Sequence, residues 1–323
     1  MADIDIEQLR RSLAERGGRW SAGETSMTRI PPAERQRRLG VDLDETRLAE
    51  HRQRPEPDLA LVVAESAVGP EVRNREAEVE RAAATVRDSM ALRRRAEELV
   101  SVAGLPFWWF LLVDWRSRFG LDAVTSVKDQ GGCGSCVSFG TIATLESMLL
   151  IERSLGLDLS EAELLFCGGG GCGGWWPDAA VTYLRARGVG QEGCFPYQPW
   201  DMPCAPCGRR DGEAIKVRAS TVLFDVGQRK DYLAWIGPTM CVFAVYADFY
   251  GYTGGVYSHV SGGFEGLHCV EVVGYDDFER CWICKNSWGG GWGDGGFFRI
   301  AYGQCEIDTT YPFWGVSRTE FWT

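Results

Sequence analysis

Hydrophobic residues are spaced differently before and after residue 105, and this difference divides the chain into two regions. Residues 69–100 are mostly good helix formers, and four valines in them are separated by seven or fourteen positions, with Arg93 interrupting the repeat. These valines are Val72, Val79, Val86 and Val100. Beyond residue 105, apolar residues gather in short β-rich runs, among them CVFAVYADF, CVEVVGYDD and CWICKNSW, which follow one early helical segment. The pattern predicts a charged, mainly helical region at residues 1–104 and an α+β domain at residues 105–323.

The early helical segment, residues 137–156, has apolar side chains on all sides rather than on one face. Such a helix is expected to lie in the centre of a folded domain. Cys136 directly precedes the segment and so falls at the helix N-terminus, where free backbone N–H groups and the helix dipole favour an anion. A thiolate at Cys136 is therefore expected to be stabilised.

Composition and charge limit the possible functions. Residues 1–100 hold 20 acidic residues and 18 arginines but no lysine, whereas all twelve cysteines lie at or beyond Cys133. The net charge of −11 argues against nucleic acid as a partner, because phosphate binding needs a basic surface. The first residues are charged where a secretory signal needs an apolar run, and LPFWWFLLV is too short to span a bilayer. We therefore expect neither a signal peptide nor a membrane span.

The charged N-terminal region has two interpretations from its pattern alone. A solvated helix that lies on a partner surface is favoured over a self-associating coiled coil, because the seven-residue repeat is short and broken. Within this region HRQRPEPDLALVV, residues 51–63, is expected to be a linker.

Two cysteines three positions apart, Cys133 and Cys136, have a spacing that serves three chemistries. Zinc binding needs a second pair with this spacing, and the chain has two, Cys204/Cys207 and Cys281/Cys284. The second of these, Cys281/Cys284, lies inside an apparent strand, where a knuckle turn is absent. A redox dithiol needs a βαβ context, which the preceding residues do not supply. A nucleophilic cysteine beside a structural one needs a base, a residue that orients the base and an oxyanion donor.

The chain contains a candidate for each group that a nucleophilic cysteine needs. His268 lies 132 positions after Cys136, Asn286 lies 18 further on, and Gln130 precedes Cys136 by six. The other two of the three histidines lie in the charged N-terminal region and in GVYSHVSGG. This set favours a cysteine nucleophile over zinc or a redox pair.

Four segments resemble the papain-like cysteine peptidases. VDWRSRFGLDAVTSVKDQGGCGSC resembles the start of the mature family domain, LSEAELLFC its next helix, CGGWWPDAA its cleft wall and CWICKNSWGGGWGDGGFFRI its Asn and Trp segment. The resemblance runs from Val113 to Trp314 and is specific, because all four segments occur in order at compatible spacing. It implies a two-lobed α+β fold, with a central helix in one lobe and a barrel-like sheet in the other, and peptide hydrolysis without a cofactor or metal.

The resemblance also implies a role for each matching position. Cys136 would be the nucleophile, His268 the general base and then acid, Asn286 the residue that orients the imidazole, and Gln130 the oxyanion donor beside the Cys136 N–H. Cys136 and His268 are expected to form a thiolate–imidazolium pair. Trp288 is expected to shield the hydrogen bond between His268 and Asn286 from water.

Disulfides and buried thiols follow from the same resemblance and from the cysteine positions. By resemblance, Cys133 pairs with Cys172, and Cys167 reaches Cys204 or Cys207. Three further cysteines lie in β-rich runs and are expected to be buried apolar thiols. These are Cys241, Cys269 and Cys284.

The resemblance also implies a substrate cleft lined by uncharged side chains. By resemblance, its residues are Gly174, Trp175, Trp176, Pro177, Val242, Cys269, Trp288 and Thr310. The pocket for the second residue before the scissile bond is expected to favour Leu, Val or Phe, because a buried Arg would lack a partner there. Trp175 stands where the family has a glycine, and its indole either narrows the cleft or adds a stacking surface.

By its position, the N-terminal region resembles a peptidase prosegment, although it lacks the Glu/Arg/Phe/Asn helix pattern of the best-known members. A prosegment would lie in the cleft and silence the enzyme until removed, whereas the other interpretation is a permanent interaction domain. The favoured function is a cysteine endopeptidase made as a zymogen, with peptide or protein substrates. The alternative is a non-proteolytic binding protein with an obstructed cleft. Disulfides indicate an extracellular or other oxidising compartment, although no signal peptide is visible.

Overall fold

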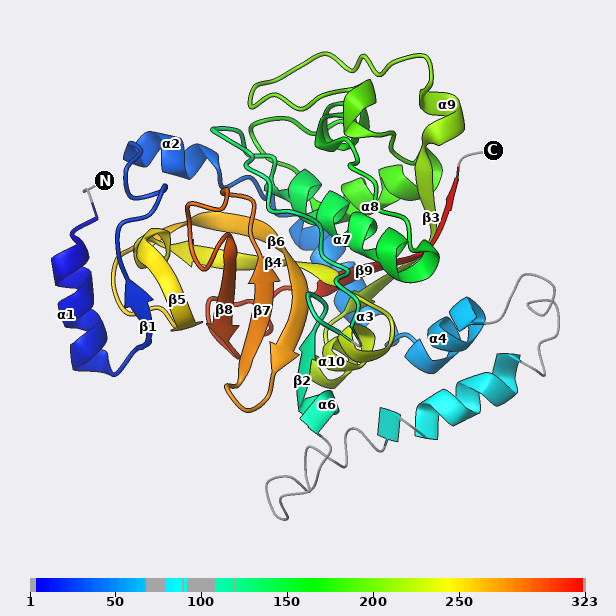
Figure 1. The fold of residues 1–323 in the computed structure, drawn as a ribbon, viewed down its shortest axis with the longest axis horizontal. Helices are drawn as coiled ribbons and strands as arrows, with labels where there is room; N and C mark the ends of the chain where they lie inside the picture. The colour runs from blue at the N-terminus through cyan, green and yellow to red at the C-terminus, as the bar shows by residue number, and fades with distance from the viewer. Residues whose placement is uncertain (1–3, 68–78, 89, 92–107, 119, 322–323) are drawn as a thin grey trace.

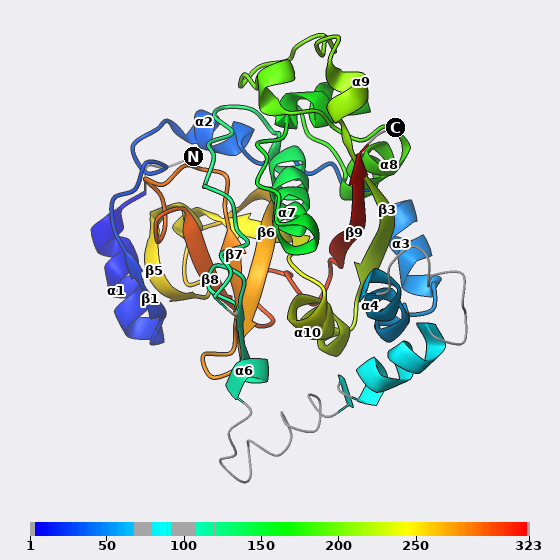
Figure 2. The same cartoon turned by 45° about the vertical axis from the view of Figure 1, so that its right-hand side comes forward.

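The computed structural model of this chain describes residues 4–67, 79–88, 90–91, 108–118 and 120–321. A curved sheet that includes β5, β7 and β8 lies on one side of the molecule, and helices α7 and α8 lie on the other (Figure 1). The same division is seen after a turn of the view, where α7 stands between the curved sheet and the β3–β9 pair (Figure 2). The α+β fold with two lobes is confirmed.

In the described part of the chain, nine strands form one sheet in the order β1-β5-β8-β7-β6-β4-β9-β3, and β2 pairs with β6 outside this path. The pairings between these strands are antiparallel except that of β5 with β8. The strands are β1 (Arg19–Ala22), β2 (Leu112–Asp114), β3 (Ile215–Leu223), β4 (Thr239–Tyr246), β5 (Tyr252–Tyr257), β6 (Phe264–Asp276), β7 (Cys281–Lys285), β8 (Phe297–Ala301) and β9 (Phe313–Phe321).

The helices of the described chain are α1 (Ile6–Arg16), α2 (Pro32–Arg37), α3 (Glu45–Gln53), α4 (Leu59–Ala67), α6 (Trp108–Leu111), α7 (Cys136–Arg153), α8 (Pro177–Ala186), α9 (Arg210–Glu213) and α10 (Val226–Trp235). Three short helical turns complete the elements. They are η1 (Glu163–Cys167), η2 (Glu192–Cys194) and η3 (Ala247–Gly251).

The central position expected for the apolar helix is confirmed by α7, which is buried along nearly its whole length. It packs against β6, β9 and β4 and so joins the two lobes. Gly140 permits the close contact with β6, because a Cβ atom there would lie 3.1 Å from the sulfur of Cys269. The helix therefore holds its first residue, Cys136, against the strand that carries His268.

Strand β6 is the longest strand and lies between β4 and β7. Its second half is buried, as is almost all of β4. Burial on both faces explains why these strands are continuous apolar runs in the sequence rather than alternations of apolar and polar residues. Gly274 lets β2 approach, because a Cβ atom there would lie 1.8 Å from the carbonyl oxygen of Val113. The sheet thus provides a rigid support for His268.

Three disulfides hold the loops of the helical lobe. They are Cys133–Cys172, Cys167–Cys204 and Cys194–Cys207. Six cysteines are free, and all six are buried: Cys136, Cys241, Cys269, Cys281, Cys284 and Cys305. Neither further pair with zinc-like spacing forms a knuckle, because Cys204 and Cys207 belong to different disulfides and the other pair lies within β7.

The N-terminal region runs along the body of the protein from the curved sheet to the helical side (Figure 1). It is not purely helical, because β1 pairs with β5 and extends the sheet. Residues 51–63 are not a linker throughout: α3 ends at Gln53 and α4 begins at Leu59. Of the four valines spaced by sevens, Val72 and Val100 lie outside the described residues.

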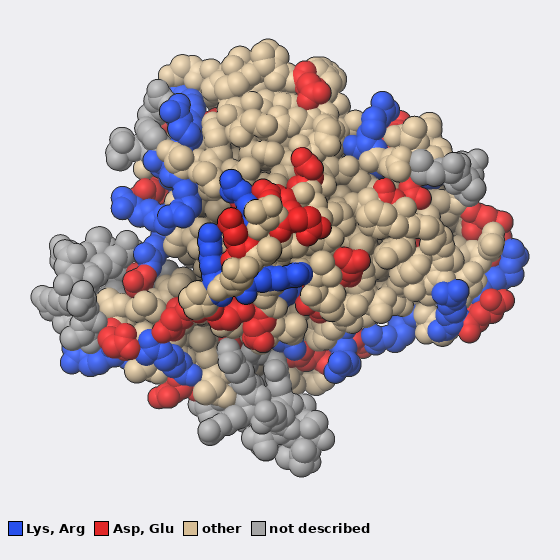
Figure 3. Space-filling view, turned by 180° about the vertical axis from the view of Figure 1, so that it is seen from behind, with Lys and Arg blue, Asp and Glu red and all other residues tan. Residues whose placement is uncertain are grey.

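Among the described helices, none has the length and apolarity needed to cross a membrane. On the face opposite to that of Figure 1, acidic and basic side chains are interspersed rather than separated into fields of one sign (Figure 3).

Candidate active site

Cys136 is the first residue of α7 and is completely buried. Ser135 precedes it without capping the helix through its side chain, so backbone N–H groups of the first turn remain available. The disulfide between Cys133 and Cys172 secures the preceding turn, and the N–H of Gly134 donates to the Cys172 carbonyl at 3.0 Å. Cys133 is thus a structural sulfur beside a free thiol.

His268 lies on β6 and faces a residue that orients its ring. Its Nε2 is 2.8 Å from Oδ1 of Asn286, an oxygen that also accepts from the N–H of Ser287 at 2.8 Å. Because this oxygen is an acceptor, His268 carries the proton on Nε2. Its other nitrogen, Nδ1, is buried without a hydrogen-bond partner among the described residues. The ring of Trp288 lies 4.8 Å from the imidazole and shields it from water.

Gln130 has its side-chain amide held in one orientation. Its Oε1 accepts from the Ser287 hydroxyl at 2.6 Å, and its Nε2 donates to the Cys133 carbonyl at 2.8 Å. Tyr197 supports the same loop, because its hydroxyl donates to the Gln130 carbonyl at 2.8 Å and is 2.7 Å from the Ser135 hydroxyl. Ser287 and Tyr197 were not predicted, since nothing in the local pattern shows that they reach this loop.

The N-terminal segment of residues 38–42 covers these groups. Nε2 of Gln130 donates to the Arg38 carbonyl at 2.9 Å, so a backbone oxygen of the segment already occupies the amide that was predicted to be the oxyanion donor. Gly40 lies against Gly134 so closely that a Cβ atom on Gly40 would be 1.8 Å from the Gly134 carbonyl oxygen. A prosegment in the cleft was expected, but residues 38–42 were not identified as the part that covers these groups, although a lone glycine between two charged helical stretches was a signal.

Trp175 binds the same segment through its backbone. Its N–H donates to the Gly40 carbonyl at 2.9 Å, and its carbonyl accepts from the N–H of Asp42 at 3.0 Å. Its indole is buried against the glycine-rich loop, because Cβ atoms on Gly168 and Gly170 would lie 2.5 and 2.8 Å from the ring. The side chain therefore packs onto that loop and does not block the Trp175 backbone, which pairs with Gly40 and Asp42.

The charge state of the covered site differs from the expected thiolate–imidazolium pair. Burial lowers the pKa of the His268 imidazole to about 4, against the opposing effect of its hydrogen bond to Asn286. Burial also raises the pKa of the Cys136 thiol to about 11, although backbone N–H groups of Cys269 and Gly40 oppose the shift. Both groups are therefore neutral at pH 7 while the segment excludes water.

The residues implied for the substrate pocket lie on α8, β4 and β6 and in the loops between elements. Trp176 and Pro177 begin α8, and Val242 on β4 faces Cys269 on β6 in register. The sulfur of Cys269 lies close to Gly140 of α7, so it packs on the helix. The remaining residues are Gly174, in the left-handed region with φ 128°, Trp288 and Thr310. The sequence analysis missed Trp314, whose ring meets that of Trp176 edge to face at 5.4 Å.

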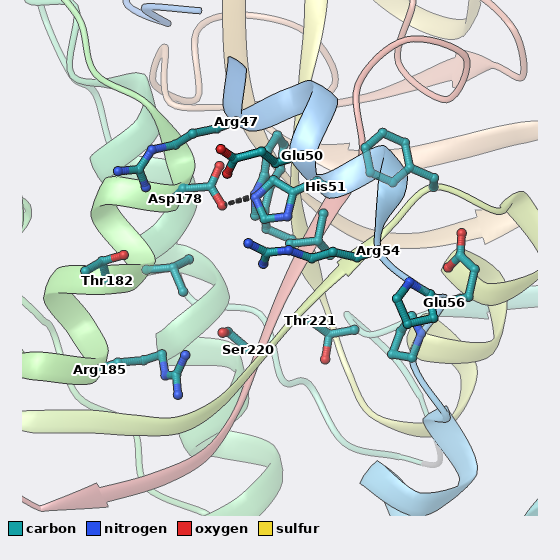
Figure 4. Close-up of a pocket in the computed structure, with 16 residues that line it drawn as sticks. Arg47, Glu50, His51, Arg54, Glu56, Asp178, Thr182, Arg185, Ser220 and Thr221 are labelled. Carbon is teal, nitrogen blue, oxygen red and sulfur yellow. Dashed lines mark hydrogen bonds and ion pairs between the residues drawn. The ribbon is translucent and has the colours of Figure 1, made fainter. Parts of the chain in front are cut away.

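Helix α3 of the N-terminal region is fastened to α8 by a buried pair. Nε2 of His51 and Oδ1 of Asp178 are 2.6 Å apart, and the two side chains are only 10% and 12% exposed (Figure 4). Beside this pair is a cavity of about 430 Å³, into which Arg54 and Arg185 extend from opposite walls (Figure 4). No role was predicted for His51 in the charged N-terminal region, because its partner is 127 positions away.

No cluster of three or more residues able to hold a metal ion is found in the described part of the chain. The arrangement instead brings together a thiol at a helix terminus, an oriented imidazole and an amide donor. Such a set is suited to acyl transfer from an amide.

Comparisons with known proteins point to one family. Residues 111–313 match the model of the family described as papain family cysteine protease. The thiol protease aleurain of Arabidopsis thaliana is 34% identical over 213 residues, which are 62% of this chain and 59% of aleurain. The match thus spans less than two thirds of that relative's length.

Solved structures share the fold, one of them over nearly the whole chain and another over about two thirds of it. Procathepsin B S9 from Trypanosoma congolense superposes with a TM-score of 0.72 at 23% identity, and the match covers 98% of this chain and all of that one. The Carica candamarcensis cysteine protease CMS1MS2 has a TM-score of 0.57 at 30% identity, and the match covers 66% of this chain and 99% of that protein. The first of these is a proform, so the likeness in fold extends to the N-terminal region.

Proposed function

This chain belongs to the papain family of cysteine proteases, and on that premise we propose that it is the latent form of a cysteine endopeptidase. Cys136 is the nucleophile, His268 the general base and then acid, and Asn286 the residue that orients the imidazole. Gln130 and the N–H of Cys136 stabilise the oxyanion. Residues 1–104 act as an inhibitory prosegment, and residues 105–323 as the peptidase domain.

The reaction proceeds in two steps at the sulfur of Cys136. The thiol attacks the carbonyl carbon of the scissile bond while its proton passes to His268, and the oxyanion is held by the Gln130 amide. The C–N bond then breaks, and the imidazolium gives its proton to the leaving amine. Water, deprotonated by the same ring, attacks the thioester, and the sulfur leaves as the acid is released.

The observation that carries the proposal is the occupation of the oxyanion donor by the Arg38 carbonyl at 2.9 Å. A backbone carbonyl at this point takes the place that a substrate carbonyl needs. The neighbouring Gly40 closes the approach to Cys136, because its backbone lies against Gly134. The parallel bridge between Val41 and Trp175 continues the contact along the cleft wall. These contacts support a site that is assembled and obstructed in the same molecule.

The full chain with Cys136→Ala tests this function. The parent is expected to shorten itself and then hydrolyse a quenched fluorescent casein, whereas the variant does neither, because the reaction loses its nucleophile. Cys305→Ala is the matched control, since Cys305 is also a buried free thiol but lies in the loop after β8. Self-processing by purified Cys136→Ala protein would overturn the proposal.

The second candidate is a papain-fold binding protein that does not cleave, and the complete burial of Cys136 is the observation in its favour. In that case the parent hydrolyses no casein and a thiol-reactive epoxide never reaches Cys136, even after limited proteolysis of the N-terminal region.

A further inference from the structure

Arg38 places its guanidinium on an acidic residue at the rim of the cleft. Its Nη1 is 2.6 Å from Oδ1 of Asp129, and the Arg38 side chain is only 9% exposed. The backbone of the same residue lies at Gln130, the neighbour of Asp129. Arg38 therefore makes two contacts at this rim: its carbonyl accepts from the Gln130 amide, and its side chain pairs with Asp129.

Asp129 is held in place independently of Arg38. Its Oδ1 accepts from the N–H of Gly131 at 2.9 Å, and its backbone forms an antiparallel bridge with Trp288. Gly289 leaves room for the carboxylate, because a Cβ atom there would lie 3.3 Å from Oδ2. The carboxylate is thus positioned before any ligand binds, which lowers the cost of recognition.

The basic residue beside Asp129 in sequence does not neutralise it. Nζ of Lys128 is bound to Glu146, Asp158 and Glu161 at 3.1, 2.6 and 2.8 Å. Within the described part of the chain, Arg38 is the basic side chain at ion-pair distance from Asp129. Removal of residues 38–42 leaves a fixed carboxylate, already 52% exposed, at the rim.

This carboxylate lies on the leaving-group side of the nucleophile. Gly40 and Asp42 pair with the backbone of Trp175, whereas Arg38, which precedes them, contacts Gln130 and Asp129. Asp129 bridges to Trp288, whose ring lies 4.8 Å from that of His268, and in the proposed reaction His268 gives its proton to the leaving amine. A substrate residue just after the scissile bond enters the same region.

We propose that Asp129 forms a subsite for a basic side chain, Arg or Lys, at the first residue after the scissile bond. The inference rests on the proposed endopeptidase function. Arginine fits best, because its guanidinium can share the fixed carboxylate in the way that Arg38 does. Since the pair is partly exposed, the gain in kcat/KM over a neutral side chain is about threefold to fivefold.

The test compares two quenched fluorescent peptides that are identical except for arginine or neutral, isosteric citrulline after the scissile bond. The full chain is allowed to activate and is assayed without separation of its segments. Asp129→Asn removes the charge but keeps an oxygen for the Gly131 N–H. Asp201→Asn is the matched control, because Asp201 also accepts a backbone N–H, that of Cys172 at 2.7 Å.

The parent and Asp201→Asn are expected to prefer arginine by the stated factor, and Asp129→Asn to cleave both peptides at the same rate. The preference in the parent is expected to shrink as salt rises. If the parent cleaves both peptides equally, or if Asp129→Asn keeps the preference, the subsite is wrong and the proposed function stands. If no peptide is cleaved by any preparation, the proposed function fails, and the subsite with it.

Discussion

Gly40→Ala is expected to open the covered site. Gly40 does not have a positive φ, so alanine is tolerated by the backbone itself and acts only through its added methyl group. That Cβ atom would lie 1.8 Å from the carbonyl oxygen and 2.4 Å from Cα of Gly134. Both are backbone atoms next to a disulfide-linked turn, so they cannot rotate away, and the segment must lift instead.

The size of the effect follows from the hydrogen bonds that are lost. Lifting residues 38–42 breaks three hydrogen bonds that involve the backbone of the segment: Gln130 to Arg38, Trp175 to Gly40, and Asp42 to Trp175. The ion pair of Arg38 with the half-exposed Asp129 is lost as well but adds little. At about 1 kcal/mol each, the covered state loses about 3 kcal/mol. Because 1.4 kcal/mol is a factor of ten, the population of the open state is expected to rise about 100-fold.

The assay is the rate at which iodoacetamide alkylates Cys136 in the full chain, mapped by mass spectrometry of its peptides. Gly40→Ala should react about 100-fold faster than the parent. Gly173→Ala is the matched control, because a Cβ atom there meets nothing within 4 Å and the residue is close to the same cleft wall. If Gly40→Ala reacts as slowly as the parent, residues 38–42 do not restrict access to the thiol.

Two further outcomes are expected. Burial holds the pKa of His268 at about 4 in the covered site, against about 6.5 for an exposed imidazole. Between pH 6.5 and pH 4 His268 therefore binds a proton in the open site but not in the covered one, so a fall in pH favours opening. In full-length Cys136→Ala, hydrogen exchange at the N–H of Asp42, corrected for the intrinsic rate, should therefore rise about tenfold or more as pH falls from 7 to 5; an exchange rate that stays flat or declines would refute this. Cys133→Ser should lower the free energy of unfolding in urea by about 2–5 kcal/mol, because it removes a disulfide that closes a long loop, while Cys136 still reacts with an epoxide after activation. A variant that unfolds like the parent but loses the reaction would mean that the two cysteines have exchanged roles.

The central helix and the position of Cys136 were predictable because they depend on local pattern. Apolar residues on all sides of residues 137–156 indicate burial, and the helix begins at the residue that the pattern suggested. The motifs around His268 and Asn286 are short and specific, so the resemblance brought them together without a structure. Contacts within one motif or one helix are the kind that a sequence reveals.

The resemblance predicted a prosegment in the cleft, but the residues that cover the site could not be predicted, because their contacts join positions far apart in the chain. Strand β1 has only four residues, too few for an alternating pattern to be distinguished from chance. The approach of Gly40 to Gly134 and the pair of His51 with Asp178 depend on tertiary packing across more than ninety positions. The choice between Cys204 and Cys207 as the partner of Cys167 was likewise open, because spacing alone does not determine which cysteines pair.

Whether the Trp175 indole points into the cleft or away from it depends on the neighbouring residues and not on the fact that the residue is a tryptophan. A tryptophan at the cleft wall is compatible with a narrowed cleft and with a stacking surface. The neighbouring glycine-rich loop decides the matter, because Gly168 and Gly170 leave the space in which the indole is buried. Their effect is visible only once the loop is folded against α8.

The central claim, that the N-terminal segment silences an otherwise complete site, is tested most directly by labelling with a thiol-reactive epoxide. The full chain is treated before and after activation, and intact-mass and peptide mass spectrometry count the label and locate it. Before activation we expect no label on Cys136, and afterwards one label per chain, on Cys136 alone. Equal labelling of Cys136 in both states would contradict the account, as would labelling of another cysteine in its place.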